Sequence, residues 1–141
     1  MTPTVAIVLP GDPGSPRRAR RELEPLRGAL NETRFSDLRL LVSELVAEAA
    51  GAFGGAPSEA ISVNAEADRG RVLVTVQEGS KSFPTSSSVP EPATPGWSLH
   101  LVQRVSDDWG LRRDSDGATV WFELSARSRP SPRSASERVA R

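Results

Sequence analysis

The chain has 141 residues, of which 37% are hydrophobic and 26% are charged, and this suits one domain with one core. It has no cysteine, which excludes disulfide bonds, thiolate metal sites and a cysteine nucleophile. Lysine and arginine together number 18, as do aspartate and glutamate, so the formal net charge is zero. The early apolar run is too short to span a membrane and no secretory signal precedes it, so we expect a soluble cytoplasmic protein.

The amino-terminal segment predicts a strand followed by a broken helix. Residues 5–9 are apolar and precede the turn-forming stretch 10–16. Residues 17–32 have a helical composition, but Pro25 lies inside them. Proline cannot donate a backbone hydrogen bond in a helix interior, so we expect a kink or a late helix start at this position.

A longer amphipathic helix is predicted next, with Ser36 as its N-cap and the glycines at 51, 54 and 55 after its end. Its apolar residues recur at helical spacing and form one stripe. They are Leu38, Leu41, Val42, Leu45, Val46 and Ala49.

Alternating apolar and polar residues predict an antiparallel hairpin of residues 61–66 and 72–77, joined by the turn 67–70. Each strand has a single apolar face, which is typical of a sheet that helices cover on one side. Residues 79–96 are rich in serine and proline. A segment of this length and composition is predicted to be a lid or a disordered loop.

The remaining pattern predicts a helix over residues 97–109 that brings Trp109 to the core, then strands at 110–114 and 118–124. We therefore expect an α+β fold, a two-layer sandwich with helices on one face of a mostly antiparallel sheet. The predicted domain spans residues 1–125. Residues 126–141 carry five arginines against Glu137 alone and predict a disordered basic tail.

Three carboxylates of the long helix, Asp37, Glu44 and Glu48, lie in a narrow band beside its apolar stripe. Such a band can hold Mg²⁺ or orient a nucleophile beside a phosphate. It can equally be the solvated edge of an amphipathic helix, and spacing alone favours this second interpretation. Glu44 and Glu48 are four residues apart, so as like charges they repel weakly along one helix edge.

Four features occur in a fixed order along the chain: SELVAEAA in a predicted helix, VQEGS at a strand end, TPGWSL opening a helix, and ATVWFEL in the last strand. Together with the runs LRLLVSELV and LHLVQRVSDDWGLR, they make the sequence resemble the anti-sigma-factor serine/threonine kinases of the GHKL (Bergerat-fold) ATPase superfamily. The resemblance covers residues 5–126. It implies the histidine-kinase-like ATPase fold, with ATP and Mg²⁺ as cofactors.

By this resemblance, Glu44 matches the catalytic carboxylate that activates the attacking hydroxyl. Glu48 matches the position of an asparagine that coordinates Mg²⁺, so it is the expected metal ligand. Glu78 matches an aspartate that accepts a hydrogen bond from adenine, and the neighbouring Gly79 matches a glycine.

The resemblance also assigns a second glycine box, in which backbone N–H groups at a helix N-terminus approach phosphates. Gly96, Ser98 and Leu99 match this box, with Ser98 in place of a glycine. Thr119 matches a last-strand threonine near the base. Three positions thus depart from the pattern, namely Glu48, Glu78 and Ser98.

Two functions follow as alternatives. The first is an ATP-binding regulator that phosphorylates or sequesters a partner in transcriptional regulation, the implied partners being a sigma factor and an anti-sigma-factor antagonist. The second is a catalytically inactive docking module with lost or weak ATP binding. We do not expect nucleic-acid binding, although the basic tail leaves it as a third hypothesis. A homodimer, common among similar proteins, is an alternative for assembly.

Overall fold

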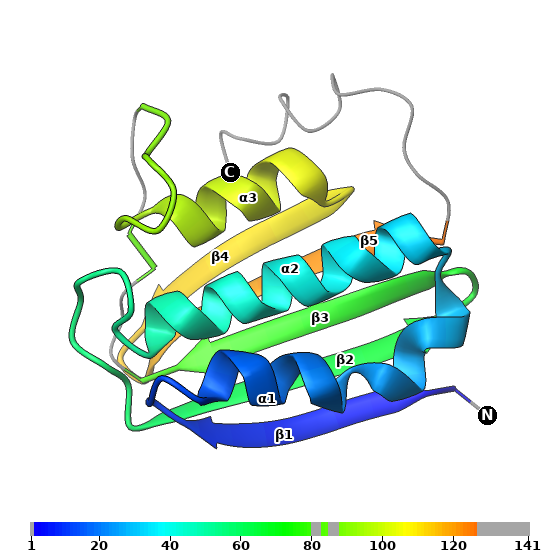
Figure 1. Cartoon of the computed structure of the whole chain (residues 1–141), viewed down its shortest axis with the longest axis horizontal. Helices are drawn as coiled ribbons and strands as arrows, with labels where there is room; N and C mark the ends of the chain where they lie inside the picture. Colours follow the sequence, from blue (N-terminus) through cyan, green and yellow to red (C-terminus); the bar gives the residue numbers. More distant parts are fainter. Residues whose placement is uncertain (1, 80–82, 85–87, 127–141) are drawn as a thin grey trace.

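A computed structural model describes residues 2–79, 83–84 and 88–126. In this part of the chain, helices cover one face of a five-stranded antiparallel sheet (Figure 1). The strands are β1 (Thr4–Pro10), β2 (Ala60–Asp68), β3 (Arg71–Glu78), β4 (Asp108–Asp114) and β5 (Gly117–Ser125), in the order β1-β2-β3-β5-β4. The helices are α1 (Ser15–Glu22), the 3-10 helix η1 (Glu24–Ala29), α2 (Glu32–Ala49) and α3 (Trp97–Val105). The predicted α+β two-layer sandwich is confirmed.

The sheet separates its two faces by strict alternation of side chains. In β3, Val72, Val74 and Val76 are fully buried under the helices, while the side chains between them point to the open face. Glu78 occupies the next inward position and is therefore also buried. The hairpin of β2 and β3 forms as predicted, with Val63 opposite Val76.

Helix α2 is the central element of the helical layer, and its predicted apolar stripe is buried against the sheet. The predicted N-cap Ser36 is wrong. The helix begins five residues earlier, at Glu32, and the side chain of Asn31 caps it by accepting a 2.8 Å hydrogen bond from the Arg34 N–H group. Asparagine caps helices as well as serine does, and the apolar stripe did not indicate the extra turn.

Pro25 interrupts the preceding helical segment as predicted. It lies in the first turn of η1, where its missing N–H group breaks no helical hydrogen bond.

The predicted helix over residues 97–109 is too long, because α3 ends at Val105. Ser106 is extended, and Asp107 already donates a backbone hydrogen bond to Glu123 in β5. Trp109 is buried as predicted, but it belongs to β4. Its four-residue spacing from Val105 agrees with helical periodicity, so the sequence pattern did not reveal the change to a strand.

Two predicted segments lie wholly or partly outside the described residues. They are the tail from residue 127 onward and residues 80–82 and 85–87 of the predicted lid. Among the described residues, no helix is long and apolar enough to cross a membrane.

A buried arginine joins the start of α2 to the end of α3 and to the sheet. The Arg34 guanidinium contacts Asp37 and Asp107 at 2.9 Å each, and it also donates to the backbone carbonyls of Val105 and Ser125. The exposed fractions of the Arg34 and Asp107 side chains are only 6% and 9%. Removing one member of such a pair leaves the other charge buried without compensation.

We predict that Arg34→Ala lowers the free energy of unfolding by about 3–5 kcal/mol, because the buried Asp107 carboxylate loses the guanidinium charge that pairs with it. Urea unfolding followed by circular dichroism would measure the loss. Arg71→Ala is the control. It removes an ion pair with Glu123 in which the arginine side chain is 61% exposed, so it should cost about 1 kcal/mol or less. Equal losses in the two variants would contradict the structural role of Arg34.

Candidate functional site

A buried polar contact joins the last turn of α2 to the first turn of α3. The Glu48 carboxylate accepts hydrogen bonds from the backbone N–H groups of Gly96 at 2.9 Å and Ser98 at 3.2 Å. The Ser98 hydroxyl also donates to Glu48, at 2.5 Å. Glu48 is only 6% exposed and Ser98 is fully buried. The structure therefore brings together Glu48, Gly96 and Ser98, three residues to which the resemblance assigns nucleotide or metal roles, and the Glu48 carboxylate itself contacts the N–H groups.

The start of α3 is a favourable place for a negatively charged group. The first N–H groups of a helix lack intrahelical partners and carry partial positive charge. The first turn of α3 contains no acidic residue of its own, and Gly96 at its N-cap has a φ of +94°, which favours glycine. Leu99 belongs to the hydrophobic core. Its side chain thus anchors α3, while the N–H groups before it face Glu48.

A second buried carboxylate lies at the end of β3. Glu78 is 1% exposed, and it accepts a hydrogen bond from the hydroxyl of Ser58. The N–H group of Ser58 donates to the carbonyl of Ala49, the residue after Glu48. Gly11 lies against the Ser58 backbone so closely that a β-carbon there would overlap the Ser58 carbonyl oxygen. Both buried glutamates are thus held near the carboxyl-terminal end of α2, where β3 also ends (Figure 1).

In the last strand, β5, Ala118 and not the predicted Thr119 lies next to the other site residues. In the β3–β5 pairing, Ala118 lies opposite Glu78 and is buried on the helical side. Thr119 is the next residue, so its side chain points to the other face of the sheet and the structure does not bring it to the other predicted site residues. Gly117 packs on the Glu78 carbonyl at a φ of +131°, a close approach that only glycine permits.

The other two carboxylates of the predicted band separate from Glu48. Asp37 pairs with Arg34 at the far end of α2. Glu44 is half-buried one turn before Glu48, and its side chain forms no hydrogen bond or ion pair with the described residues. Gly79 is exposed just after β3, and a β-carbon there would lie 3.9 Å from the Asp116 carbonyl oxygen, an ordinary van der Waals contact.

The single histidine lies beside this site without joining it. His100 stacks on Trp97 in the first turns of α3, with ring centroids 5.6 Å apart. Burial lowers the pKa of His100, and the positive charge of Arg104 lowers it further. His100 is half-buried and lies at the edge of the site.

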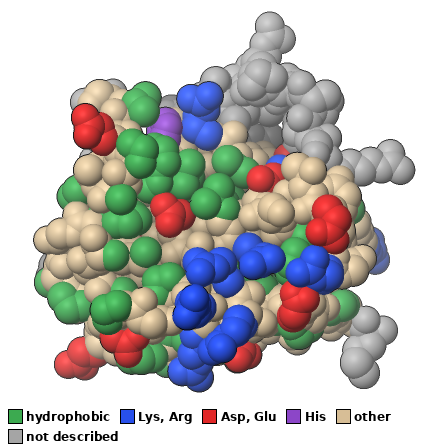
Figure 2. All heavy atoms as spheres, viewed as in Figure 1, with side chains coloured by type: hydrophobic (Ala, Val, Ile, Leu, Met, Phe, Trp, Pro, Cys, Tyr) green, Lys and Arg blue, Asp and Glu red, His purple; other side chains and the backbone are tan. Residues whose placement is uncertain are grey.

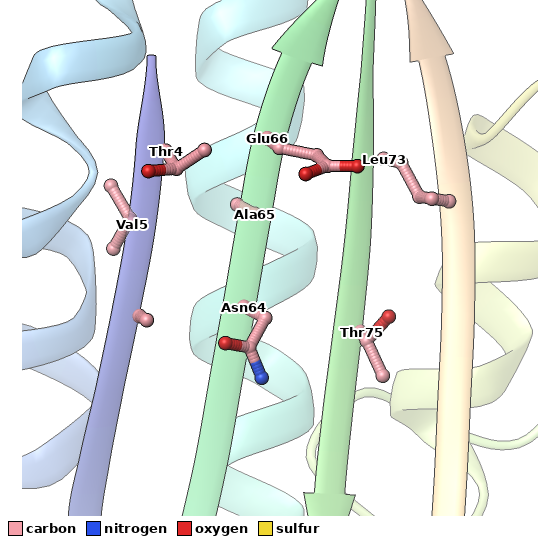
Figure 3. Close-up of a pocket in the computed structure, with 8 residues that line it drawn as sticks. Thr4, Val5, Asn64, Ala65, Glu66, Leu73 and Thr75 are labelled. Atoms are coloured by element: carbon pink, nitrogen blue, oxygen red, sulfur yellow. The ribbon is translucent and has the colours of Figure 1, made fainter. Parts of the chain in front are cut away.

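The open face of the sheet carries a shallow hollow lined by Asn64, Glu66, Leu73 and Thr75 among others (Figure 3). Figure 3 shows the helices behind the sheet in this view, so the hollow lies on the opposite face from Glu48 and Glu78. None of the predicted site residues lines it.

The sequence did not indicate that Ser58 would donate a hydrogen bond to Glu78. Ser58 lies in an irregular segment of small residues between α2 and β2, where no periodic pattern marks one serine above another. The only available signal was the inward position of Glu78 in β3, since a buried carboxylate requires a donor.

A comparison with protein-family models matches residues 9–124 to the histidine kinase-like ATPase domain. No curated protein matches the chain. The family match agrees with the described fold, and it supports an ATP-binding regulatory role in which Mg²⁺ usually accompanies the nucleotide.

The residues of this chain do not fit Mg²⁺ and ATP in the described arrangement. The N–H groups at the start of α3 already bind the Glu48 carboxylate, and both of its oxygens are engaged. A phosphate oxygen about 4 Å from that carboxylate would be repelled by about 4 kcal/mol near a protein surface. Among the described residues, no cluster of three or more acidic, histidine or cysteine side chains is placed to hold a metal ion.

We predict that Ser58→Ala lowers the free energy of unfolding by about 1–3 kcal/mol, because the buried Glu78 carboxylate loses a donor. Chemical unfolding monitored by circular dichroism would measure it. Ser62→Ala in β2 is the matched control, since Ser62 is half-buried and its side chain forms no hydrogen bond with the described residues. That variant should stay within about 0.5 kcal/mol of the parent protein. A loss for Ser58→Ala no larger than this would contradict the role of Ser58.

Proposed function

Because the chain belongs to the histidine kinase-like ATPase domain family, we propose that it is a regulator of the anti-sigma-factor type that acts by binding and sequestering a partner protein. The partner class is a sigma factor or an antagonist protein that competes for it, and the site of action is the cytoplasm. The family supports an ATP-binding regulatory role. In this chain we propose that nucleotide binding is weak, because Glu48 competes for the same N–H groups.

One observation carries this proposal, namely the engagement of the Glu48 carboxylate by Gly96 and Ser98. An acidic side chain at the start of a helix satisfies the same donors and the same positive charge that a phosphate would satisfy. The Glu48 carboxylate is therefore the anion that already occupies this position. These contacts hold the start of α3 without a nucleotide.

A second candidate function is phosphorylation of a serine on the partner, and the position of Glu44 favours it. Glu44 is half-buried on α2, and it lies one turn before Glu48 with no partner among the described residues. A general base requires such a carboxylate without competing contacts. This function requires Glu48 to leave α3 first, so nucleotide titration separates the two candidates.

We predict that Glu48→Ala binds Mg²⁺ and ATP at least about tenfold more tightly than the parent protein, because it removes a negative charge and frees the N–H groups of α3. Isothermal titration calorimetry on the full chain would measure both affinities. Combining Glu48→Ala with Ser98→Gly should preserve or increase the gain, since the change also removes the serine hydroxyl.

Glu44→Gln is the control for charge, because Glu44 makes no contact with the N–H groups of α3. It should leave the affinity within about twofold of the parent value, a difference of less than 0.5 kcal/mol. Tight nucleotide binding by the parent protein, unchanged in Glu48→Ala, would refute the proposal that Glu48 closes the site and would favour the kinase function.

A further inference from the structure

A groove lined almost entirely by arginine runs between the first helical segments and α2. Its lining residues are Arg17, Arg20, Arg21, Glu24, Arg27 and Arg39. Figure 2 shows basic side chains gathered on the helical face of the molecule, over the region of α1 and the first half of α2 in Figure 1. This groove is separate from the contacts of Glu48 and Glu78, and none of the residues with a predicted nucleotide role lines it.

The positive charge of the groove is largely uncompensated. Arg27 pairs with Glu24 at 2.9 Å and with Glu32 at 3.3 Å. The other four lining arginines form no ion pair with any described residue. Arginines held together in one groove repel one another, which raises the electrostatic free energy of the isolated protein. An acidic ligand would reduce this repulsion.

The guanidinium groups are also partly positioned before any ligand binds. Arg27 lies 4.6 Å and Arg39 5.8 Å from the centre of the Phe35 ring, which is itself buried. Cation–π contacts of this kind hold the two groups over one surface. The other three arginines lie on α1, which its buried residue Ala19 anchors against the core. Preorganised guanidinium forks match carboxylates bidentately.

We propose that this arginine groove is the docking surface for an acidic segment of a partner protein. This proposal rests on the proposed function in one respect, namely that a protein partner exists. It adds the surface of this chain that binds the partner and the type of side chain that the partner contributes. A nucleic acid fits the groove less well. Its bases would need aromatic stacking surfaces, whereas no aromatic residue lines the groove and Phe35 is covered by Arg27 and Arg39.

The test uses the full chain and a fluorescently labelled glutamate-rich peptide as the probe, with a glutamine-rich peptide of equal length as its neutral control. Fluorescence anisotropy would measure binding. The double variant Arg17→Glu and Arg21→Glu should bind the acidic peptide at least about tenfold more weakly than the parent protein. The affinity of the parent protein should fall steeply as salt rises, and the neutral peptide should not bind.

The matched control is Arg18→Glu with Arg112→Glu, which changes the net charge equally. Arg18 is exposed on the same helix but does not line the groove, and Arg112 lies on β4. The control should retain the parent affinity. Equal weakening in both double variants would overturn the proposal, because it would show attraction to net charge alone.

Two further measurements separate the alternatives. A single-stranded oligonucleotide with the same charge as the acidic peptide should bind more weakly than the peptide. Tighter binding of the oligonucleotide would overturn the proposal in favour of a nucleic-acid surface. If the glutamate variant fails to fold by circular dichroism, Arg17→Gln with Arg21→Gln carries the same expectation of weaker binding. No ATP is present in these assays, so a failure of the docking proposal is distinguishable from a failure of the Glu48 proposal, which ATP titration tests.

Discussion

The position of α3 depends on a carboxylate from another helix. Glu48, in the last turn of α2, accepts the N–H groups of Gly96 and Ser98 and the Ser98 hydroxyl, and so places a negative charge at the positive end of α3. The contact is buried, which makes it strong and also costly to break. The same contact determines the chemistry of the site, because the donors that would hold a phosphate are the donors that hold Glu48.

Helix α3 is joined to α2 by polar groups at both ends and by apolar packing between them. Arg34 binds the carbonyl of Val105 at the end of α3, and Glu48 binds its beginning. Between these contacts, Leu99 and Val102 belong to the core. These contacts consequently fix the position of the two helices relative to each other. A phosphate at the start of α3 would compete with the Glu48 contact alone, because the Arg34 contact lies at the other end of the helix.

The formal net charge of zero conceals an uneven distribution of charge. Acidic groups are buried at Glu48 and Glu78, whereas unpaired arginines gather on an outer groove. Carboxylates inside the molecule are satisfied by its own donors, but surface arginines without partners remain available to other molecules. This distribution is the physical basis of the proposed docking of an acidic partner segment in the arginine groove.

The sequence alone determined the layers of the fold, because burial imposes a period of two on strands such as β3 and a helical period on α2. Its resemblance also indicated the ATPase family. Only the tertiary structure decided which atoms meet. Gly96 and Ser98 are 48 and 50 residues beyond Glu48, and Ser58 is 20 residues before Glu78. Thr119 and Ala118 differ by one position and so face opposite sides of the sheet. Local patterns fix which side of an element is buried, whereas hydrogen-bond partners are chosen by how distant elements pack.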